Sequence, residues 1–391
     1  MDILLDDQEV QIREAAAEFL EGECTPALVR RVETDALQYS PELWSKFAEN
    51  GWLQLCLSNR AGGEALPLPY LGLLFEVAGY HIAPIPLHAT MVSAMIIDRH
   101  GSPEQIAMLQ AVIAGELILS HAVAEQTGRW STEAIALQGR IDGQELVLNG
   151  SKTFVGSYGV SQQCMVIYRD ASAPEQLGVV LVPTDTKGLS SEALISMAKD
   201  GESKVQFNDV RVPLTARIGS AALGNLIARE LMDLSSVLYA SMIAGAARRT
   251  LDMAVAHAKQ REAFGQPIGA FQAIQHMCAN MVNAIDGTTM LSREALWRMQ
   301  ENLPYQVNVA QAKSFGNEQC MMVVRSAQQI HGGMGFIRDF DLNLWYRRVG
   351  SWSLRGGTAA EHRRTIAAAL IDQSQKVRIG VIPTFYEPPV D

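Results

Sequence analysis

The chain has 391 residues, of which 48% are hydrophobic and 19% are charged, and its formal net charge at pH 7 is −10. This length is sufficient for two or three domains with buried cores. The acidic balance argues against a nucleic-acid-binding protein, which needs a basic surface. The negative net charge does not exclude a phosphate-rich cofactor, because phosphate binding depends on the arginines and lysines near the site.

Neither a metal site nor a disulfide framework is predicted. The five cysteines are widely spaced and form no CxxC pair, so reduced and mostly buried thiols are expected. The eight histidines show no paired metal-ligand spacing. The first ten residues are acidic where a targeting signal would be basic, and prolines and charges interrupt the apolar runs. We therefore predict a cytoplasmic protein without a membrane span.

Residues 1–117 are predicted to form an N-terminal helical domain. Apolar residues recur there every three or four positions, which is the helical period. Ser102-Pro103 is typical of an N-cap followed by proline at the first helical position.

Residues 118–220 are predicted to form a middle antiparallel β domain, because the apolar period falls to two. Asp142-Gly143 and Asn149-Gly150 are both typical of hairpin turns between strands.

Residues 221–391 regain the helical period and are predicted to form a C-terminal four-helix bundle. Long helices are expected at about 228–262 and 271–302, with small residues that permit close helix packing. The proline-containing tail after Val377 is expected to wrap a surface or a neighbour. The predicted fold class is α+β, in the order helical domain, β domain, helical bundle.

Two segments carry the strongest functional signal: QREAFGQPIGAFQAIQHMCANM (260–281) and QIHGGMGF (329–336). They closely resemble the C-terminal signature of acyl-CoA dehydrogenases, and the order of domains matches that family over essentially the whole chain. The resemblance implies an FAD-dependent oxidoreductase. Its reaction would be α,β-desaturation of an acyl-CoA thioester, with electrons passed to an electron-transfer flavoprotein.

These segments supply most of the predicted cofactor contacts. An arginine suits a pyrophosphate, phenylalanines offer apolar faces, and glutamine amides bond adenine, ribose or phosphate, while glycines admit close backbone approach. Taken singly, the arginine would be a surface ion pair and the phenylalanines core residues. The resemblance implies that the set reaches across a dimer interface to a neighbour's FAD. Its members are Arg261, Phe264, Phe271, Gln272, Gln329, Gly332 and Gly333.

The usual catalytic base is missing. In the family, a carboxylate removes the α-proton, usually from the Glu of a Glu-Gly-Thr motif, and the matching position here is Gly356. Arg355 precedes it and cannot act as a base because it stays protonated. Some relatives place the Glu on the long helix, and that position is Ser235 here. No catalytic residue is therefore predicted.

Other nearby carboxylates do not replace the base. Helical geometry turns Glu230 and Asp233 away from the face that carries Ser235. Glu361 follows Thr358 with the spacing of a capping box for the last helix. The arginine that faces CoA in relatives is Ser236 here.

The β domain also departs from the family. Relatives carry a Thr-Glu-Pro-like stretch and a Trp-Ile-Thr segment facing the flavin, and here these positions include Ala124 and Phe154. Two hydroxyl donors are therefore lost, although strand residues of this kind are also ordinary core. The remaining predicted cofactor contacts are Val123, Ala124, Phe154 and Thr358.

Three hypotheses remain open. The chain is one subunit of a heteromer, such as the heterotetramers that act on steroid side chains, whose homologous partner supplies the carboxylate. Alternatively, it is a homo-oligomeric flavoenzyme with an unusual base or altered chemistry, or a non-catalytic structural or regulatory subunit. Residues that would reach a neighbour's FAD are kept and those for the chain's own cleft are degraded, which favours the first. The acyl group is not predicted, and small residues at Ser235, Ser236 and Gly356 are expected to leave extra room.

Overall fold

The computed structural model describes residues 4–371, which divide into two compact units. Of the described residues, the helical unit contains 4–26, Pro67–Ala83 and 236–371. The sheet unit contains Ala27–Leu66 and Pro84–Ser235. Helix α8 (Gly224–Gln260) begins in the sheet unit and continues into the helical unit. The tail after Val377 lies outside the described residues.

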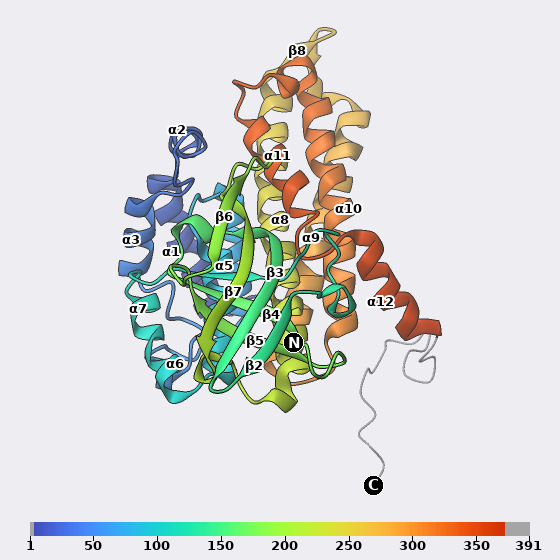
Figure 1. The fold of residues 1–391 in the computed structure, drawn as a ribbon. Helices are drawn as coiled ribbons and strands as arrows, with labels where there is room; N and C mark the ends of the chain where they lie inside the picture. Colours follow the sequence, from blue (N-terminus) through green and yellow to red (C-terminus); the bar gives the residue numbers. More distant parts are fainter. Residues whose placement is uncertain (1–3, 372–391) are drawn as a thin grey trace. The chain divides into compact units, whose positions relative to one another are not determined.

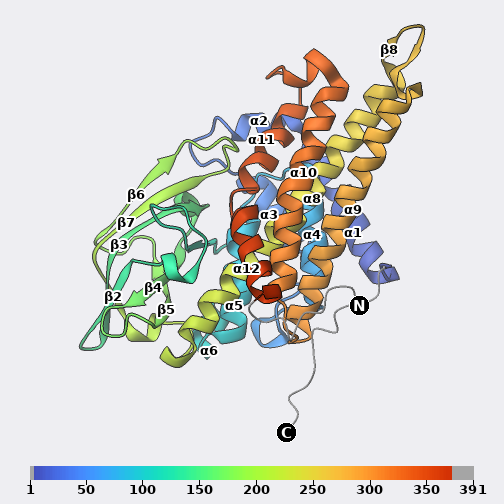
Figure 2. The ribbon, with the colours of Figure 1, turned by 90° about the vertical axis from the view of Figure 1, so that its right-hand side faces the viewer.

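Long helices dominate the helical unit. Figure 2 shows α8, α9 and α10 running side by side. Glycine makes the approach of α4 to α8 possible, since a Cβ on Gly245 would lie 1.8 Å from the carbonyl oxygen of Glu76. The two predicted long helices are confirmed, with ends within four residues of the expected ones. The helices are α1 (Asp7–Glu23), α4 (Leu68–His81), α8, α9 (Gln272–Gln300), α10 (Gln306–His331), α11 (Leu342–Trp352) and α12 (Ala359–Ile371).

The sheet unit combines short helices with one seven-stranded sheet (Figure 1). The strands run in the order β1-β4-β2-β3-β7-β6, with β5 also paired to β4. Ser102 caps α6 through its side chain, which confirms the predicted N-cap. The helices of this part are α2 (Pro26–Val32), α3 (Pro41–Glu49), α5 (Leu87–His100), α6 (Pro103–Ala107) and α7 (Leu109–Ile113). The strands are β1 (Leu119–Ala122), β2 (Gln138–Asp142), β3 (Glu145–Gly156), β4 (Gln163–Asp170), β5 (Leu177–Pro183), β6 (Leu189–Leu194) and β7 (Glu202–Pro213).

The sheet differs from the prediction in two respects. It is mixed rather than antiparallel, because β4 pairs in parallel with both β1 and β2. The hairpin at Asp142-Gly143 is confirmed, but the one at Asn149-Gly150 is wrong, because both residues lie inside β3. The Asn149 side chain bonds Asp209 on β7 at 2.9 Å, and Gly150, with φ +138°, absorbs a register shift. The glycine therefore accommodates a bulge rather than a reversal.

The sheet packs one face into a core of aliphatic and aromatic residues, including Val155, Val166, Tyr168 and Phe207. All five cysteines are free thiols, and Cys278 is the one that is not fully buried. Among residues 4–371, no helix is long and apolar enough to cross a membrane.

Candidate functional site

The first predicted motif forms a projecting hairpin at one end of the helical unit (Figure 1). Strands β8 (Glu262–Ala263) and β9 (Gln266–Pro267) pair directly after α8 ends. Phe264 and Gly265 form the turn with φ values of +55° and +80°, the signature of a tight hairpin turn with both central residues left-handed. Arg261 is exposed at its base, and its carbonyl accepts a bond of 2.8 Å from the N–H of Ile268. This bond uses only the backbone of Arg261, so the guanidinium is not part of the hydrogen bonds that form the hairpin.

The second motif forms a turn at the end of α10. Gly332 has φ +60° and ψ −139°, a conformation that essentially requires glycine. A Cβ added at Gly332 or Gly333 would meet no atom within 4 Å, so the backbone there is open to an approaching ligand. Gln329 is exposed on the preceding turn of α10.

A pair of stacked histidines holds the two motifs at the same end of the unit. The rings of His257, in the last turns of α8, and His331, at the end of α10, have centroids 4.5 Å apart. Burial, with further contributions from His331 and Arg261, lowers the pKa of His257. The contact between the two rings places the Arg261 hairpin at the same end of the helical unit as the Gly332 turn.

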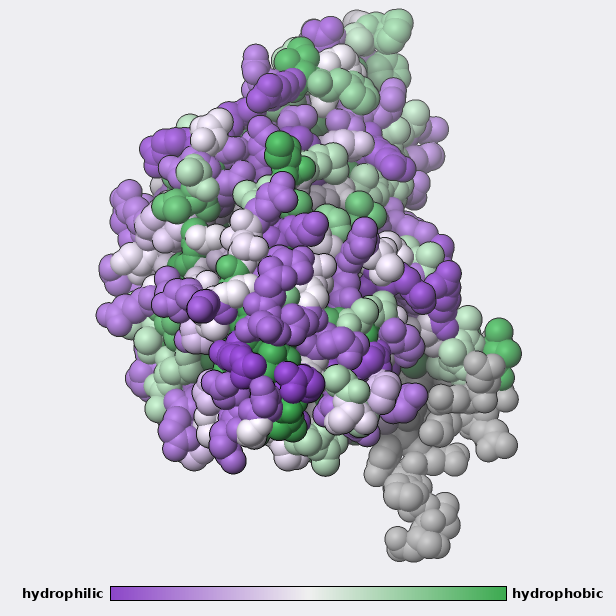
Figure 3. All heavy atoms as spheres, in the orientation of Figure 1, coloured by the Kyte–Doolittle hydropathy of each residue, from purple (hydrophilic) through white to green (hydrophobic). Residues whose placement is uncertain are grey.

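We call this group of residues the cradle: Arg261, Phe264, Phe271, Gln272, Gln329, Gly332 and Gly333. Its apolar members are unusually exposed, with the Phe264 side chain 95% accessible and its ring in edge contact with Phe271 at 6.1 Å. Phe336 and Met334, from the neighbouring turn, are 66% and 50% exposed. The end of the molecule that carries the hairpin shows green residues among purple ones in Figure 3. Large exposed apolar side chains of this kind mark a contact surface.

Gly356, which matches the position of the family's usual base, belongs to a second region, the glycine loop (residues 352–358). The carbonyl oxygen of Gly356 accepts bonds from Ser236 Oγ at 2.8 Å and from His362 Nε2 at 2.7 Å. Burial lowers the pKa of His362 to about 4, which keeps the ring neutral. Two buried side chains therefore fix the backbone where relatives carry the catalytic carboxylate.

A buried lysine fixes the rest of the loop. Lys313 Nζ donates to Asn317 Oδ1 at 2.6 Å and to the carbonyl of Trp352 at 3.0 Å. The Asn317 amide in turn donates to the carbonyl of Gly357 at 3.1 Å. Burial lowers the pKa of Lys313 well below its usual value. Together with Gly356, three carbonyls of the loop, those of residues 352, 356 and 357, therefore accept bonds from side chains of the same chain.

The glycine loop leaves no room at Gly356 itself. A Cβ at this position would lie 3.1 Å from Ser236 Cα, 3.2 Å from Tyr239 Cδ2 and 3.4 Å from Lys313 Cε. The space next to the Gly356 Cα is therefore tight, and the expectation that the three small residues leave extra room in a substrate cleft stays a prediction.

The alternative base position, Ser235, lies in a buried cluster of the sheet unit. His88 Nε2 lies 3.0 Å from the Ser235 carbonyl, and His121 Nε2 lies 3.4 Å from Ser235 Oγ. Burial lowers the pKa of His121 to about 4. No sequence motif singles out these two histidines, since the contacts join three distant segments.

Two carboxylates near Ser235 in sequence have different surroundings. Glu230 is paired with Arg99 and with His100, whose Nε2 lies 2.7 Å away. Burial opposes ionisation of Glu230, but its bonds to His100 and Arg99 lower the pKa overall. Asp233, in contrast, has a buried Oδ2 without a hydrogen-bond partner among residues 4–371, and burial raises its pKa to about 7. A near-neutral pKa suits a base, which the helical projection alone did not indicate.

Two predicted flavin contacts of the sheet unit, Val123 and Ala124, have backbone carbonyls that accept bonds within the chain. Lys152 is fully buried, and its Nζ donates to the Val123 carbonyl at 3.0 Å and to Glu125 at 2.8 Å. The Ala124 carbonyl accepts a bond of 2.9 Å from the N–H of Thr153. Burial lowers the pKa of Lys152 to about 8, although Glu125 raises it. Both carbonyls are thus used within the chain.

Phe154 and Thr358 complete the predicted set. Phe154 lies at an irregularity of β3 with φ +54° and is 53% exposed, so its ring is accessible. Thr358 and Glu361 form the predicted capping box of α12, with Glu361 Oε2 accepting from the Thr358 N–H and hydroxyl at 2.9 Å. That cap is confirmed, and the role of Thr358 toward a cofactor stays a prediction.

The cradle fits the nucleotide part of a dinucleotide. It offers an exposed guanidinium, two exposed amides, an accessible aromatic pair and an open glycine backbone, which together suit phosphates, a ribose and an adenine. Among residues 4–371, no group of three or more His, Cys, Asp or Glu side chains could hold a metal ion.

Comparison with known families defines the class of protein, a family of flavoprotein oxidoreductases. Models of the N-terminal, middle and C-terminal domains of acyl-CoA dehydrogenases match residues 6–116, 120–210 and 224–371. The chain belongs to the acyl-CoA dehydrogenase family, whose members bind FAD.

Relatives with different activities match over nearly their whole length. The chain is 28% identical to a 3-(aryl)acrylate reductase of Clostridium sporogenes, over 93% of this chain and 99% of the relative. It is 26% identical to a short-chain specific acyl-CoA dehydrogenase of Clostridium acetobutylicum, over 95% and 100% of the two chains. A solved variant of the Tcur3481-Tcur3483 steroid acyl-CoA dehydrogenase shares 26% identity, with a TM-score of 0.86 over 94% of this chain and 99% of that one.

Proposed function

We propose that the chain is one subunit of a heteromeric acyl-CoA dehydrogenase, in which it holds the nucleotide part of an FAD whose flavin lies in a homologous partner. One observation carries the proposal. The cradle is exposed and open, whereas both base positions, Gly356 and Ser235, are buried and lack a carboxylate. An exposed and open cradle is not expected in a chain that has no role in binding a cofactor.

The division of labour follows from the side chains. The Arg261 guanidinium binds the pyrophosphate, and the amides of Gln272 and Gln329 bond the ribose or adenine. Phe264 and Phe271 shield these polar contacts from water. When bound, FAD would supply the acceptor for the hydride that leaves the β-carbon of the acyl-CoA, while the partner's carboxylate would take the α-proton. Electrons then pass to an electron-transfer flavoprotein.

The relatives support this assignment without defining the acyl group. The name of the steroid enzyme joins two proteins, as expected for an assembly of non-identical subunits. A bulky substrate such as a steroid side-chain thioester is therefore one candidate. The arylacrylate reductase shows that members of this family also act in the direction of reduction.

Expression of the chain alone and together with a homologous acyl-CoA dehydrogenase from the same organism tests the proposal. We expect little flavin on the lone chain, and stoichiometric flavin with thioester oxidation in the pair. Full FAD occupancy and turnover by the lone chain would overturn the heteromer.

Asp233 supports a second candidate, a homo-oligomeric flavoenzyme with an unusual base. Its buried Oδ2 lacks a hydrogen-bond partner among the described residues, and its pKa is raised to about 7. In that case the flavin of the pure homo-oligomer bleaches anaerobically when acyl-CoA is added, and Asp233→Asn abolishes bleaching while flavin stays bound. Unchanged bleaching in the variant would rule out Asp233.

A further inference from the structure

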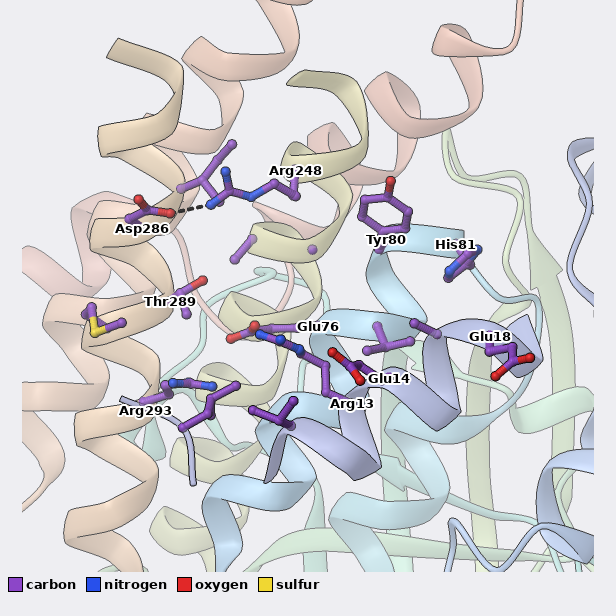
Figure 4. Close-up of a pocket in the computed structure, with 18 of the residues that line it drawn as sticks. Arg13, Glu14, Glu18, Glu76, Tyr80, His81, Arg248, Asp286, Thr289 and Arg293 are labelled. Atoms are coloured by element: carbon purple, nitrogen blue, oxygen red, sulfur yellow. Dashed lines mark hydrogen bonds and ion pairs between the residues drawn. The ribbon is translucent and has the colours of Figure 1, made fainter. Parts of the chain in front are cut away.

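The helical unit contains a cavity of about 960 Å³ that neither the cradle nor the glycine loop lines. It lies among α1, α4, α8 and α9 (Figure 4). Its apolar wall includes Leu5, Val10, Ile285 and Met290. This volume is typical of sites for small organic ligands.

A carboxylate with a buried oxygen lines the cavity. Glu76 Oε1 is inaccessible to solvent and has no hydrogen-bond partner among residues 4–371. Burial raises the pKa of Glu76 to about 7, although Arg293, Arg13 and Arg248 oppose the rise. Buried polar atoms without partners are rare, because each costs free energy, and they often mark a functional role.

Two arginines face this carboxylate with unused donors. Arg248 is paired with Asp286, as the dashed line in Figure 4 shows. Arg13, on α1, and Arg293, on α9, make no hydrogen bond or ion pair within the described part of the chain, and Figure 4 shows them on the two sides of Glu76. A guanidinium stays charged and presents five donors in a planar fork. Two such forks beside an apolar wall suit an anion with an apolar tail.

We propose that this cavity binds an amphipathic carboxylate, with its head group between Arg13 and Arg293 and its tail along the Leu5–Met290 wall. The surroundings favour a monoanion over a phosphate dianion, because the rim carries several acidic side chains that repel a second negative charge. A protonated Glu76 can donate a hydrogen bond to the bound carboxylate. The titratable groups that line the cavity are Arg13, Glu14, Glu18, Glu21, Glu76, Tyr80, His81, Arg248, Asp286 and Arg293.

Titration calorimetry of the full chain with octanoate tests the site. We expect saturable binding that weakens about tenfold or more in Arg13→Gln and in Arg293→Gln, since charge-assisted bonds are lost. Arg325→Gln, an exposed arginine of α10 that does not line the cavity, is the matched control and should bind normally. Octyl phosphate and octylammonium serve as head-group controls and should bind more weakly than octanoate.

Glu76 provides an independent readout. Octanoate binding above pH 7 should take up a proton, measured by calorimetry in two buffers of different ionisation enthalpy. Glu76→Gln should bind octanoate without that uptake. Absent binding, binding as tight in both arginine variants as in the unchanged chain, or tighter binding of octylammonium would each overturn the proposal. Thermal unfolding midpoints of the variants exclude misfolding as the cause of a lost signal.

Discussion

The cradle and the glycine loop belong to the same helical unit but use their polar groups in opposite ways. In the cradle, backbone bonds build the hairpin and the turn, while the Arg261 and Gln329 side chains remain exposed. In the glycine loop, buried side chains from α8, α10 and α12 bond the backbone carbonyls. Open donors suit the ligand that we propose for the cradle, whereas at Gly356 neighbouring side chains use the backbone and occupy the space around it.

Replacing Arg261 should have the largest effect on FAD retention, and it is the most direct test of the contrast between the cradle and the glycine loop. In the assembled complex, Arg261→Ala should weaken FAD retention about 10- to 100-fold, because a hydrogen bond to a charged group contributes about 1.5–3 kcal/mol. Flavin absorbance after gel filtration measures the loss. Lys259→Ala, an exposed charge two residues earlier on α8, is the control. Flavin retained in the Arg261 variant would instead favour the non-catalytic subunit.

Restoring a side chain in the glycine loop tests the other half of the comparison. Gly356→Ala should destabilise the chain by about 1–2 kcal/mol from its φ of +65°, with about 1–3 kcal/mol more from crowding against Ser236 and Tyr239. Gly356→Glu should be at least as destabilising and should not create thioester oxidation in the lone chain. Urea unfolding measures both variants.

Gly128→Ala separates the two causes of that loss. Gly128 has a φ of +66°, and a Cβ there would meet no atom within 4 Å. Its substitution should therefore show the cost of the backbone conformation alone. Equal losses at positions 356 and 128 would contradict the filled-loop interpretation.

The sequence predicted most of the fold because periodicity and turn signals are local. The long helices, the Ser102 cap, the hairpin at Asp142-Gly143 and the Thr358–Glu361 box were all predicted correctly. The Asn149-Gly150 signal failed because a tertiary partner, Asp209, keeps the strand paired beyond it. The parallel pairing of β4 was missed for a similar reason, since strand order is not encoded in the strand's own residues.

The site was predictable where a motif recorded it and not where burial decided it. The cradle residues stand in two continuous segments that carry the family resemblance, so the sequence could name them together, and their role toward a cofactor stays a prediction. The near-neutral pKa of Asp233, the His88–His121 cluster and the crowding at Gly356 depend on which distant segments pack together. A helical projection predicts the direction in which the Asp233 side chain points, but it does not predict that the side chain is buried away from water.

The pH dependence of stability is a further test of the buried contacts that fix the glycine loop. Because burial lowers the pKa of His362 from 6.5 to about 4, the unfolded chain binds a proton in this window that the folded chain does not. The free energy of unfolding should therefore fall as the pH drops from about 6.5 towards about 4.

His362→Gln keeps a donor for the Gly356 carbonyl and should reduce the slope of the unfolding free energy against pH by up to about 1.4 kcal/mol per pH unit. Urea unfolding across this range measures it, with His276→Gln, an exposed histidine of α9, as the control. An equal change of slope in both variants would disprove the role of His362.

The smallest effect is expected at the tip of the cradle. Phe264 is 95% exposed, so Phe264→Ala should change the stability of the lone chain by less than about 0.5 kcal/mol. In the complex, the same substitution should lower flavin retention about two- to tenfold, since an aromatic contact contributes about 0.5–1.5 kcal/mol. Ile195→Ala, an equally exposed apolar residue of the sheet unit, should leave retention unchanged. A Phe264 variant that destabilises the lone chain while retaining flavin in the complex would show that the ring serves the fold of the hairpin, and the cradle would lose one of its members.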